Sequence, residues 1–158
     1  NNIERLKLSI KKNNFKNIEC FHTAIGSQKG KVTLGATENY SPNYEINEVN
    51  SVINENSELN SLDFLIKIKN KSLILKIDTE GYELEVLKGL DELISRVSVI
   101  LFEHHYDNMI KKDYTFSDVH HLLKNNNFYR TFKIKMPFRK SFEYIYIRKN
   151  NESLSNNY

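Results

Sequence analysis

Cysteine is almost absent from this sequence of 158 residues, and Cys20 is its single example. One cysteine cannot build a disulfide framework, and its apolar surroundings favour an inert buried thiol over a nucleophile. Long apolar runs are also missing, since none approaches the roughly 20 residues that span a bilayer. We therefore expect a protein of a reducing compartment, the cytoplasm, without a membrane segment or a membrane partner.

A strong charge of one sign is absent too, because 23 basic residues face 20 acidic ones and leave a net charge of +3. Nucleic-acid-binding domains usually carry a denser basic stripe. The run FYRTFKIKMPFRKSFEYIYIRK at 128–149 mixes aromatic and basic residues and could form a stacking platform for bases. A hairpin that packs on the core explains its alternation better, so we expect no nucleic-acid partner. The oligomeric state stays open.

Several catalytic motifs are missing as well. The chain has no glycine-rich phosphate loop and no nucleophile elbow, which argues against P-loop enzymes and serine hydrolases. It also lacks the His-Glu-x-x-His and Cys-x-x-Cys spacings of common metal sites. We therefore assign no metal ligands from the sequence.

The composition, with 39% hydrophobic and 27% charged residues, is typical of one globular domain of this length. We expect this domain at residues 1–149, followed by a disordered polar tail at 150–158. The chain opens NNIERLKLSIKKNN, without an initiator methionine or a signal-like pattern, which indicates a piece of a longer protein.

Hydrophobic spacing predicts the elements of the first half. Ile3, Leu6 and Ile10 lie at helical spacing. The expected elements are a helix at 2–13, locally paired strands at 18–25 and 31–36, a long loop at 37–61 with one short strand near residues 52–53, and a helix from 62.

The second half predicts a strand, a helix and a strand at 72–77, 84–94 and 97–102. Both strands are continuous apolar runs, which is typical of parallel strands buried on both faces. Glu83 falls on the expected wet face of the helix. After a helix at 116–126, the pattern predicts an antiparallel hairpin with an edge strand followed by an interior strand.

Acidic residues and histidines follow the two parallel strands. Asp78 and Glu80 follow the first, and Glu103, His104 and His105 follow the second. Since ligands bind at the carboxyl ends of parallel strands, these side chains could form an acid–base cluster.

Structural roles are open alternatives for these residues. The acids could cap the following helix, His104 could be a satisfied buried histidine, and His105 could lie on the surface. Asp78, Glu103 and His104 could also serve as donors to Mg, Mn or Fe.

The stretch LKIDTEGYELEVLKGL at 75–90 resembles the strand-to-helix signature of the FkbM-type methyltransferases. The similarity extends through NNFKNIECFHTAIGSQKGKVTL, SLD at 61–63 and VILFEHH. The resemblance implies a class I, S-adenosylmethionine-dependent enzyme that methylates a hydroxyl group of a sugar or natural product. It also implies a Rossmann-like, mostly parallel α/β sheet with a C-terminal antiparallel hairpin.

Residue roles follow from the same resemblance. Thr23 and Ala24 would border the adenine of S-adenosylmethionine. Glycine also lets a chain turn sharply, so Gly81 predicts a sharp turn at which the cofactor or a backbone segment can approach closely. Asp78 and Glu80 would face the sulfonium or the acceptor hydroxyl. The expected catalytic residues are Asp78 first, then Glu80, Glu103 and His104.

The chain departs from the family at its start. The first two strand-helix units are missing, which amounts to some 50–70 residues at about 30 per repeat. Such a partial domain would bind its cofactor poorly by itself. The alternative interpretation is a non-catalytic Rossmann-like remnant that binds a glycan or a partner chain.

Overall fold

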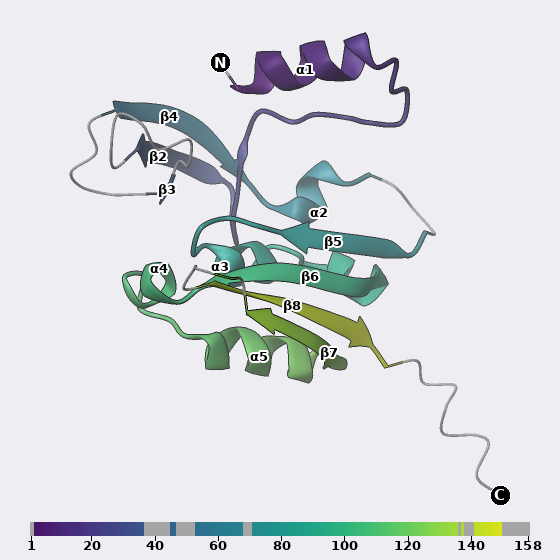
Figure 1. The fold of residues 1–158 in the computed structure, drawn as a ribbon, viewed down its shortest axis with the longest axis vertical. Coiled ribbons are helices and arrows are strands. Elements are labelled where there is room, and N and C mark those ends of the chain that lie inside the picture. The colour runs from purple at the N-terminus through teal and green to yellow at the C-terminus, as the bar shows by residue number, and fades with distance from the viewer. Residues whose placement is uncertain are drawn as a thin grey trace, which may run out of the picture.

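The computed structural model describes residues 2–36, 45–46, 53–67, 71–135, 137 and 141–149. These residues form an α/β structure with two mixed four-stranded sheets (Figure 1). Most of residues 37–52, the first part of the loop predicted at 37–61, lie outside the described residues, as does the tail predicted at 150–158. Within the described ranges, no helix is long and apolar enough to cross a membrane.

The first sheet has the strand order β1-β4-β2-β3. Its strands are β1 Ala24–Ile25, β2 Gly30–Ala36, β3 Glu45–Ile46 and β4 Ile53–Asn60. β4 pairs antiparallel with β2 from Gly30↔Leu59 to Ala36↔Ile53, and parallel with β1.

Two predictions for this region are wrong. The strand expected at 18–25 is reduced to β1, which pairs with β4 rather than with β2. The expected loop contains the eight-residue strand β4. Its sequence, INENSELN, is mostly polar, so an apolar pattern cannot reveal it. β4 pairs through backbone hydrogen bonds, which do not require apolar side chains.

The first helix is α1 Asn2–Lys12, as predicted. None of its residues is buried, and Leu6 is 50% exposed. It lies apart from both sheets at one end of the molecule (Figure 1). The element expected from residue 62 is the short helix α2 Leu62–Leu65.

The second sheet has the order β5-β6-β8-β7, with β5 Leu73–Ile77, β6 Val97–His105, β7 Phe128–Lys135 and β8 Ser141–Arg148. β5 and β6 are parallel, which confirms the predicted strand-helix-strand pairing. β8 lies antiparallel between β6 and β7, so the predicted interior and edge strands are also confirmed.

The sheets are less parallel than expected. Among the described residues, two of the six strand pairings are parallel and four are antiparallel. β5 is also not buried on both faces. It lies at an edge of its sheet among the described strands, and Ile74 is 72% exposed.

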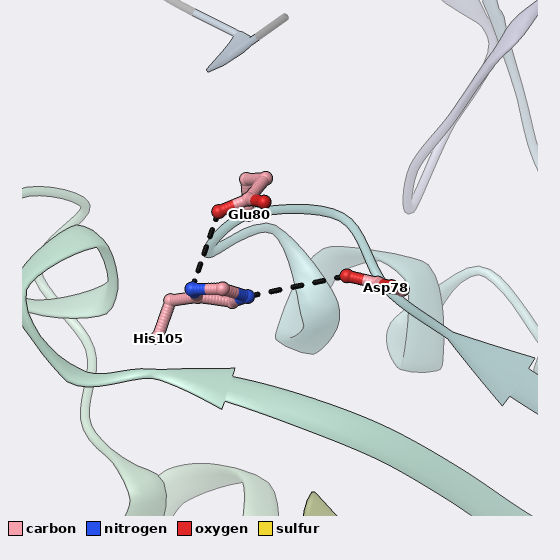
Figure 2. A group of neighbouring side chains, drawn as sticks. All are labelled: Asp78, Glu80 and His105. Carbon is pink, nitrogen blue, oxygen red and sulfur yellow. Dashed lines mark ion pairs between the residues drawn. The ribbon is translucent and has the colours of Figure 1, made fainter. Parts of the chain in front are cut away.

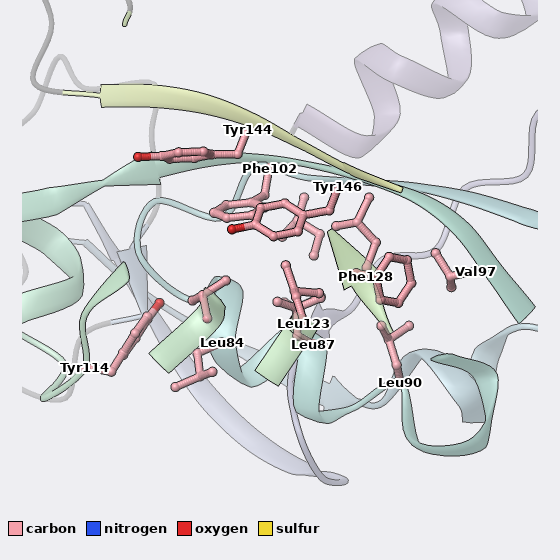
Figure 3. Close-up of a cluster of buried hydrophobic side chains, with 14 of the residues drawn as sticks. Leu84, Leu87, Leu90, Val97, Phe102, Tyr114, Leu123, Phe128, Tyr144 and Tyr146 are labelled. Atoms are coloured by element: carbon pink, nitrogen blue, oxygen red, sulfur yellow. The ribbon is translucent and has the colours of Figure 1, made fainter. Parts of the chain in front are cut away.

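The core lies between the second sheet and the helices α3 Glu83–Lys88 and α5 Phe116–Asn125. Of the apolar stripe predicted at residues 84–94, Leu84, Leu87 and Leu90 are buried there and Ile94 is partly buried. Figure 3 shows Leu84, Leu87 and Leu123 facing the rings of Phe102 and Tyr146. A 3-10 helix at Asp91–Arg96 continues α3, and α4 Tyr106–Ile110 follows β6. This packing fixes the carboxyl ends of β5 and β6, where the predicted acids lie.

Candidate functional site

The loop between β5 and α3 makes the sharp turn that its glycine predicts. Glu80 and Gly81 both have positive φ, 51° and 96°. A Cβ atom on Gly81 would lie 2.6 Å from the Cβ of Asn108. Only glycine therefore fits this position, because it tolerates both the left-handed backbone and the close approach of α4.

Glu83 holds this loop in place. The sequence places it on the wet face of the helix, which is wrong, because its exposed fraction is 0%. Its Oε1 accepts hydrogen bonds from the Thr79 backbone N–H at 3.3 Å, the Thr79 hydroxyl at 3.1 Å and the Gly81 N–H at 3.0 Å. Glu83 thus satisfies three donors of the loop that precedes α3.

Tyr114 secures the other side of the loop. Its hydroxyl donates to the Gly81 carbonyl at 2.5 Å and lies 3.2 Å from Oε2 of Glu83. Burial and the Glu83 charge raise the pKa of Tyr114, so the hydroxyl remains a donor. The N-cap of α3 is Tyr82, without a side-chain cap hydrogen bond. The acids therefore do not occupy the N-cap position, while their effect as negative charges near the start of α3 stays a prediction.

The structure brings three carboxylates around His105, and Figure 2 shows two of them, Asp78 and Glu80. The His105 Nδ1 lies 3.2 Å from Oε2 of Glu80. Its Nε2 lies 3.5 Å from Oε1 of Glu103 and 3.9 Å from Oδ1 of Asp78. The predicted acid cluster is thus real, but its imidazole is His105, whose side chain is only 17% exposed. The interpretation of His105 as a surface residue is wrong.

The cluster is closed at one side and open at the other. The Glu103 side chain is 10% exposed and that of Asp78 is 41% exposed. Glu103 Oε1 and His105 Nε2 are buried atoms without a hydrogen-bond partner among the described residues. Two polar atoms that face each other without a hydrogen bond indicate a position suited to a further group.

His104 points to the opposite face of β6, because successive strand residues alternate in direction. Its ring contacts the rings of Tyr106, Phe116 and Tyr144 at centroid distances of 6.0, 5.5 and 6.1 Å. Burial, with smaller effects from His105 and Lys133, lowers its pKa to about 4. His104 is therefore buried and neutral, which confirms the burial predicted by one alternative. It is not satisfied as that alternative predicted, because its Nδ1 has no hydrogen-bond partner among the described residues.

Thr23 and Ala24 lie at β1, and their contacts are with β4. The Thr23 hydroxyl donates to the Glu58 carbonyl at 2.7 Å, and Nδ2 of Asn60 donates to Thr23 Oγ1 at 2.9 Å. Asn60 is 5% exposed, and its Oδ1 is without a hydrogen-bond partner in the described part of the chain. The sequence did not single out Asn60, because the strand that it ends was not recognised.

Comparison with known families supports the sequence resemblance. The family described as Methyltransferase FkbM domain matches residues 3–130. Comparisons with curated proteins and with solved structures give no significant match. The matched segment contains both parallel strands and the entire carboxylate cluster, and it covers well over half of the 158 residues. The chain therefore belongs to the FkbM methyltransferase domain family.

Proposed function

We propose that this chain acts in S-adenosylmethionine-dependent O-methylation, with a hydroxyl group of a sugar or another natural product as the acceptor. Family membership supports methyltransferase activity. The observation that carries the proposal is the group of three carboxylates and one imidazole at the ends of the parallel strands β5 and β6. Open α/β sheets bind their ligands at this position.

The residues present fit the proposed cofactor. S-adenosylmethionine carries a positive sulfonium, and Asp78 and Glu80 provide negative charge at the solvent-open side of the cluster. The Oδ1 of Asn60 could accept a hydrogen bond from an amino group such as that of adenine, with Thr23 and Ala24 beside it. When bound, the cofactor supplies an electrophilic methyl group.

The chain's own residues would orient the acceptor and take its proton. Methyl transfer to oxygen requires the hydroxyl to be held in line with the methyl–sulfur bond and to lose its proton. Asp78 is the best candidate because it is the most exposed carboxylate of the three around His105. His105 is better placed than His104 to share this proton, and a catalytic role for His104 stays a prediction.

The proposal can be tested with the complete gene product, including any residues that precede Asn1. Transfer of a labelled methyl group from S-adenosylmethionine to a panel of sugars and hydroxylated natural products would be measured. Asp78→Ala should lower turnover by about 10²–10⁴-fold, the range for loss of a positioned base. Glu92→Gln, which removes an acid from the 3-10 helix, is the control and should not change turnover.

Two results would count against the proposal. Wild-type turnover in the Asp78→Ala variant would exclude a catalytic role for Asp78. If the complete protein showed no rise in melting temperature with S-adenosylmethionine, a non-catalytic module that binds a glycan or a partner chain would replace the enzyme.

A further inference from the structure

We propose that the carboxylate cluster is a binding site for a divalent metal ion, with His105 Nε2, Asp78 and Glu103 as ligands and Glu80 as the residue that orients His105. This site goes beyond the proposed function and does not rest on it, because metal binding can be measured without methyl transfer. The sequence offered His104 as the nitrogen donor, and the structure replaces it with its neighbour.

The position of Glu80 determines which nitrogen of His105 is available. Its carboxylate lies 3.2 Å from Nδ1 (Figure 2), so it can accept the Nδ1–H hydrogen bond. A neutral imidazole with its proton on Nδ1 presents the lone pair of Nε2. Metal-binding histidines commonly have such a carboxylate at their second nitrogen, which fixes both tautomer and ring orientation.

The surroundings of Nε2 suit a cation. Glu103 Oε1 and Asp78 Oδ1 lie 3.5 and 3.9 Å away, and neither distance is a normal hydrogen bond. Metal–ligand bonds of about 2.0–2.2 Å place neighbouring ligands about 3–3.5 Å apart. Asp78 and His105, with Glu80, already offer ligand atoms that lie within 4.8 Å of one another, and the exposed Asp78 side chain can move toward an ion held by His105 and Glu103.

Glu103 provides an independent reason to expect an ion. This residue is 8% exposed, and its Oε1 is buried without a hydrogen-bond partner in the described residues. A buried carboxylate oxygen is costly unless a charge or donor compensates it. Oε1 faces Nε2 of His105, which likewise lacks a hydrogen bond in the described part of the chain, and a cation between them would satisfy both atoms.

The nearby lysine does not occupy this position. The Nζ of Lys76 lies 3.5 Å from Oδ2 of Asp78, whereas Oδ1 is the oxygen directed to His105. The lysine side chain is 62% exposed, so it does not close the cluster. The open side at Asp78 would give the ion a path from solvent and leave coordination positions for water or a substrate oxygen.

The donor set indicates the class of metal. Two carboxylates and one imidazole suit a cation that accepts both oxygen and nitrogen, such as Mn²⁺, Fe²⁺ or Zn²⁺, better than Mg²⁺, which prefers oxygen. Mn²⁺ is the practical probe, because the free ion gives an electron paramagnetic resonance signal that decreases on binding.

The experiment titrates chelator-treated complete protein with MnCl₂ and follows that signal. We expect one Mn²⁺ per chain in the wild type. Asp78→Asn and His105→Gln should each weaken binding by at least about 100-fold, and Glu80→Gln by about 10–100-fold, the cost of losing an orienting partner. Glu92→Gln removes an equal charge outside the cluster and should bind like the wild type.

No uptake by the wild type at millimolar manganese would overturn the metal site. Uptake that Asp78→Asn and His105→Gln leave unchanged would overturn it equally. Circular dichroism would confirm that each variant folds, and Asp78→Asn is decisive because its exposed side chain contributes little to packing. The manganese titration and the methyl-transfer assay are separate measurements. A protein that binds no manganese could still transfer methyl groups, so the two proposals can fail separately.

Discussion

Replacement of Glu83 tests whether this buried acid holds the loop at residues 78–82, between β5 and α3, in place. Its Oε1 accepts three hydrogen bonds from Thr79 and Gly81. Glu83→Ala would leave the buried Gly81 N–H and the half-buried Thr79 N–H without their acceptor. At about 1–3 kcal/mol for each buried donor, with Thr79 at the low end, the free energy of unfolding should fall by about 2–4 kcal/mol.

The Glu83→Gln variant keeps the shape of the side chain and removes its negative charge. The amide oxygen can still accept, but a hydrogen bond to a neutral group contributes about 1 kcal/mol less than one to a charged group, or roughly 3 kcal/mol over three bonds. The smaller desolvation penalty of the amide offsets part of this loss. Glu83→Gln should therefore be the milder change.

Urea unfolding followed by circular dichroism would measure the free energy of unfolding of both variants. Glu92→Gln, at an exposed position of the 3-10 helix, is the control. Methyl transfer should fall in both as well, because the loop carries Asp78 and Glu80. The reasoning would be refuted if Glu83→Ala lay within about 0.5 kcal/mol of the wild type, the usual range of a surface change. A Tyr114→Phe variant should couple to Glu83→Gln by about 0.5–3 kcal/mol in a double-mutant cycle, because both residues contact the same loop.

Two further predictions concern the scaffold. Gly89→Ala should destabilise the protein by about 1–3 kcal/mol or more, because its Cβ would lie 2.0 Å from the Gly26 carbonyl oxygen. Gly30→Ala is the matched control, because a Cβ atom on Gly30 would have no neighbouring atom within 4 Å. Equal melting temperatures of the Gly89→Ala and Gly30→Ala variants would contradict the predicted clash with Gly26. His120 should make stability depend on pH: burial, then Arg130, lowers its pKa, and its Nδ1 lies 2.7 Å from the Tyr146 hydroxyl. The unfolded chain then takes up the proton first, so the free energy of unfolding should fall as pH drops below about 6.5. His120→Gln should remove this component in urea titrations at several pH values, and an unchanged pH profile would contradict it.

The second sheet could be predicted because its strands have a strong apolar signal. VSVILF is a nearly continuous apolar run and FEYIYI is apolar on both faces, and both are inner strands of the sheet. β4 could not be predicted, because its side chains are mostly polar and its partner β2 is separated from it in the chain. Only pairing in space identifies such a strand.

The sequence by itself determined the family, the glycine turn at Gly81 and the presence of acids at two strand ends, because these depend on local spacing and residue type. The tertiary structure decided which side chains form the carboxylate cluster. It selected His105 over His104, because the packing of the aromatic core against one face of β6 leaves the other face for the cluster. It also buried Glu83, through contact with Tyr114 far along the chain. Such contacts between distant segments are not encoded in local periodicity, which is why the sequence alone could not assign either residue.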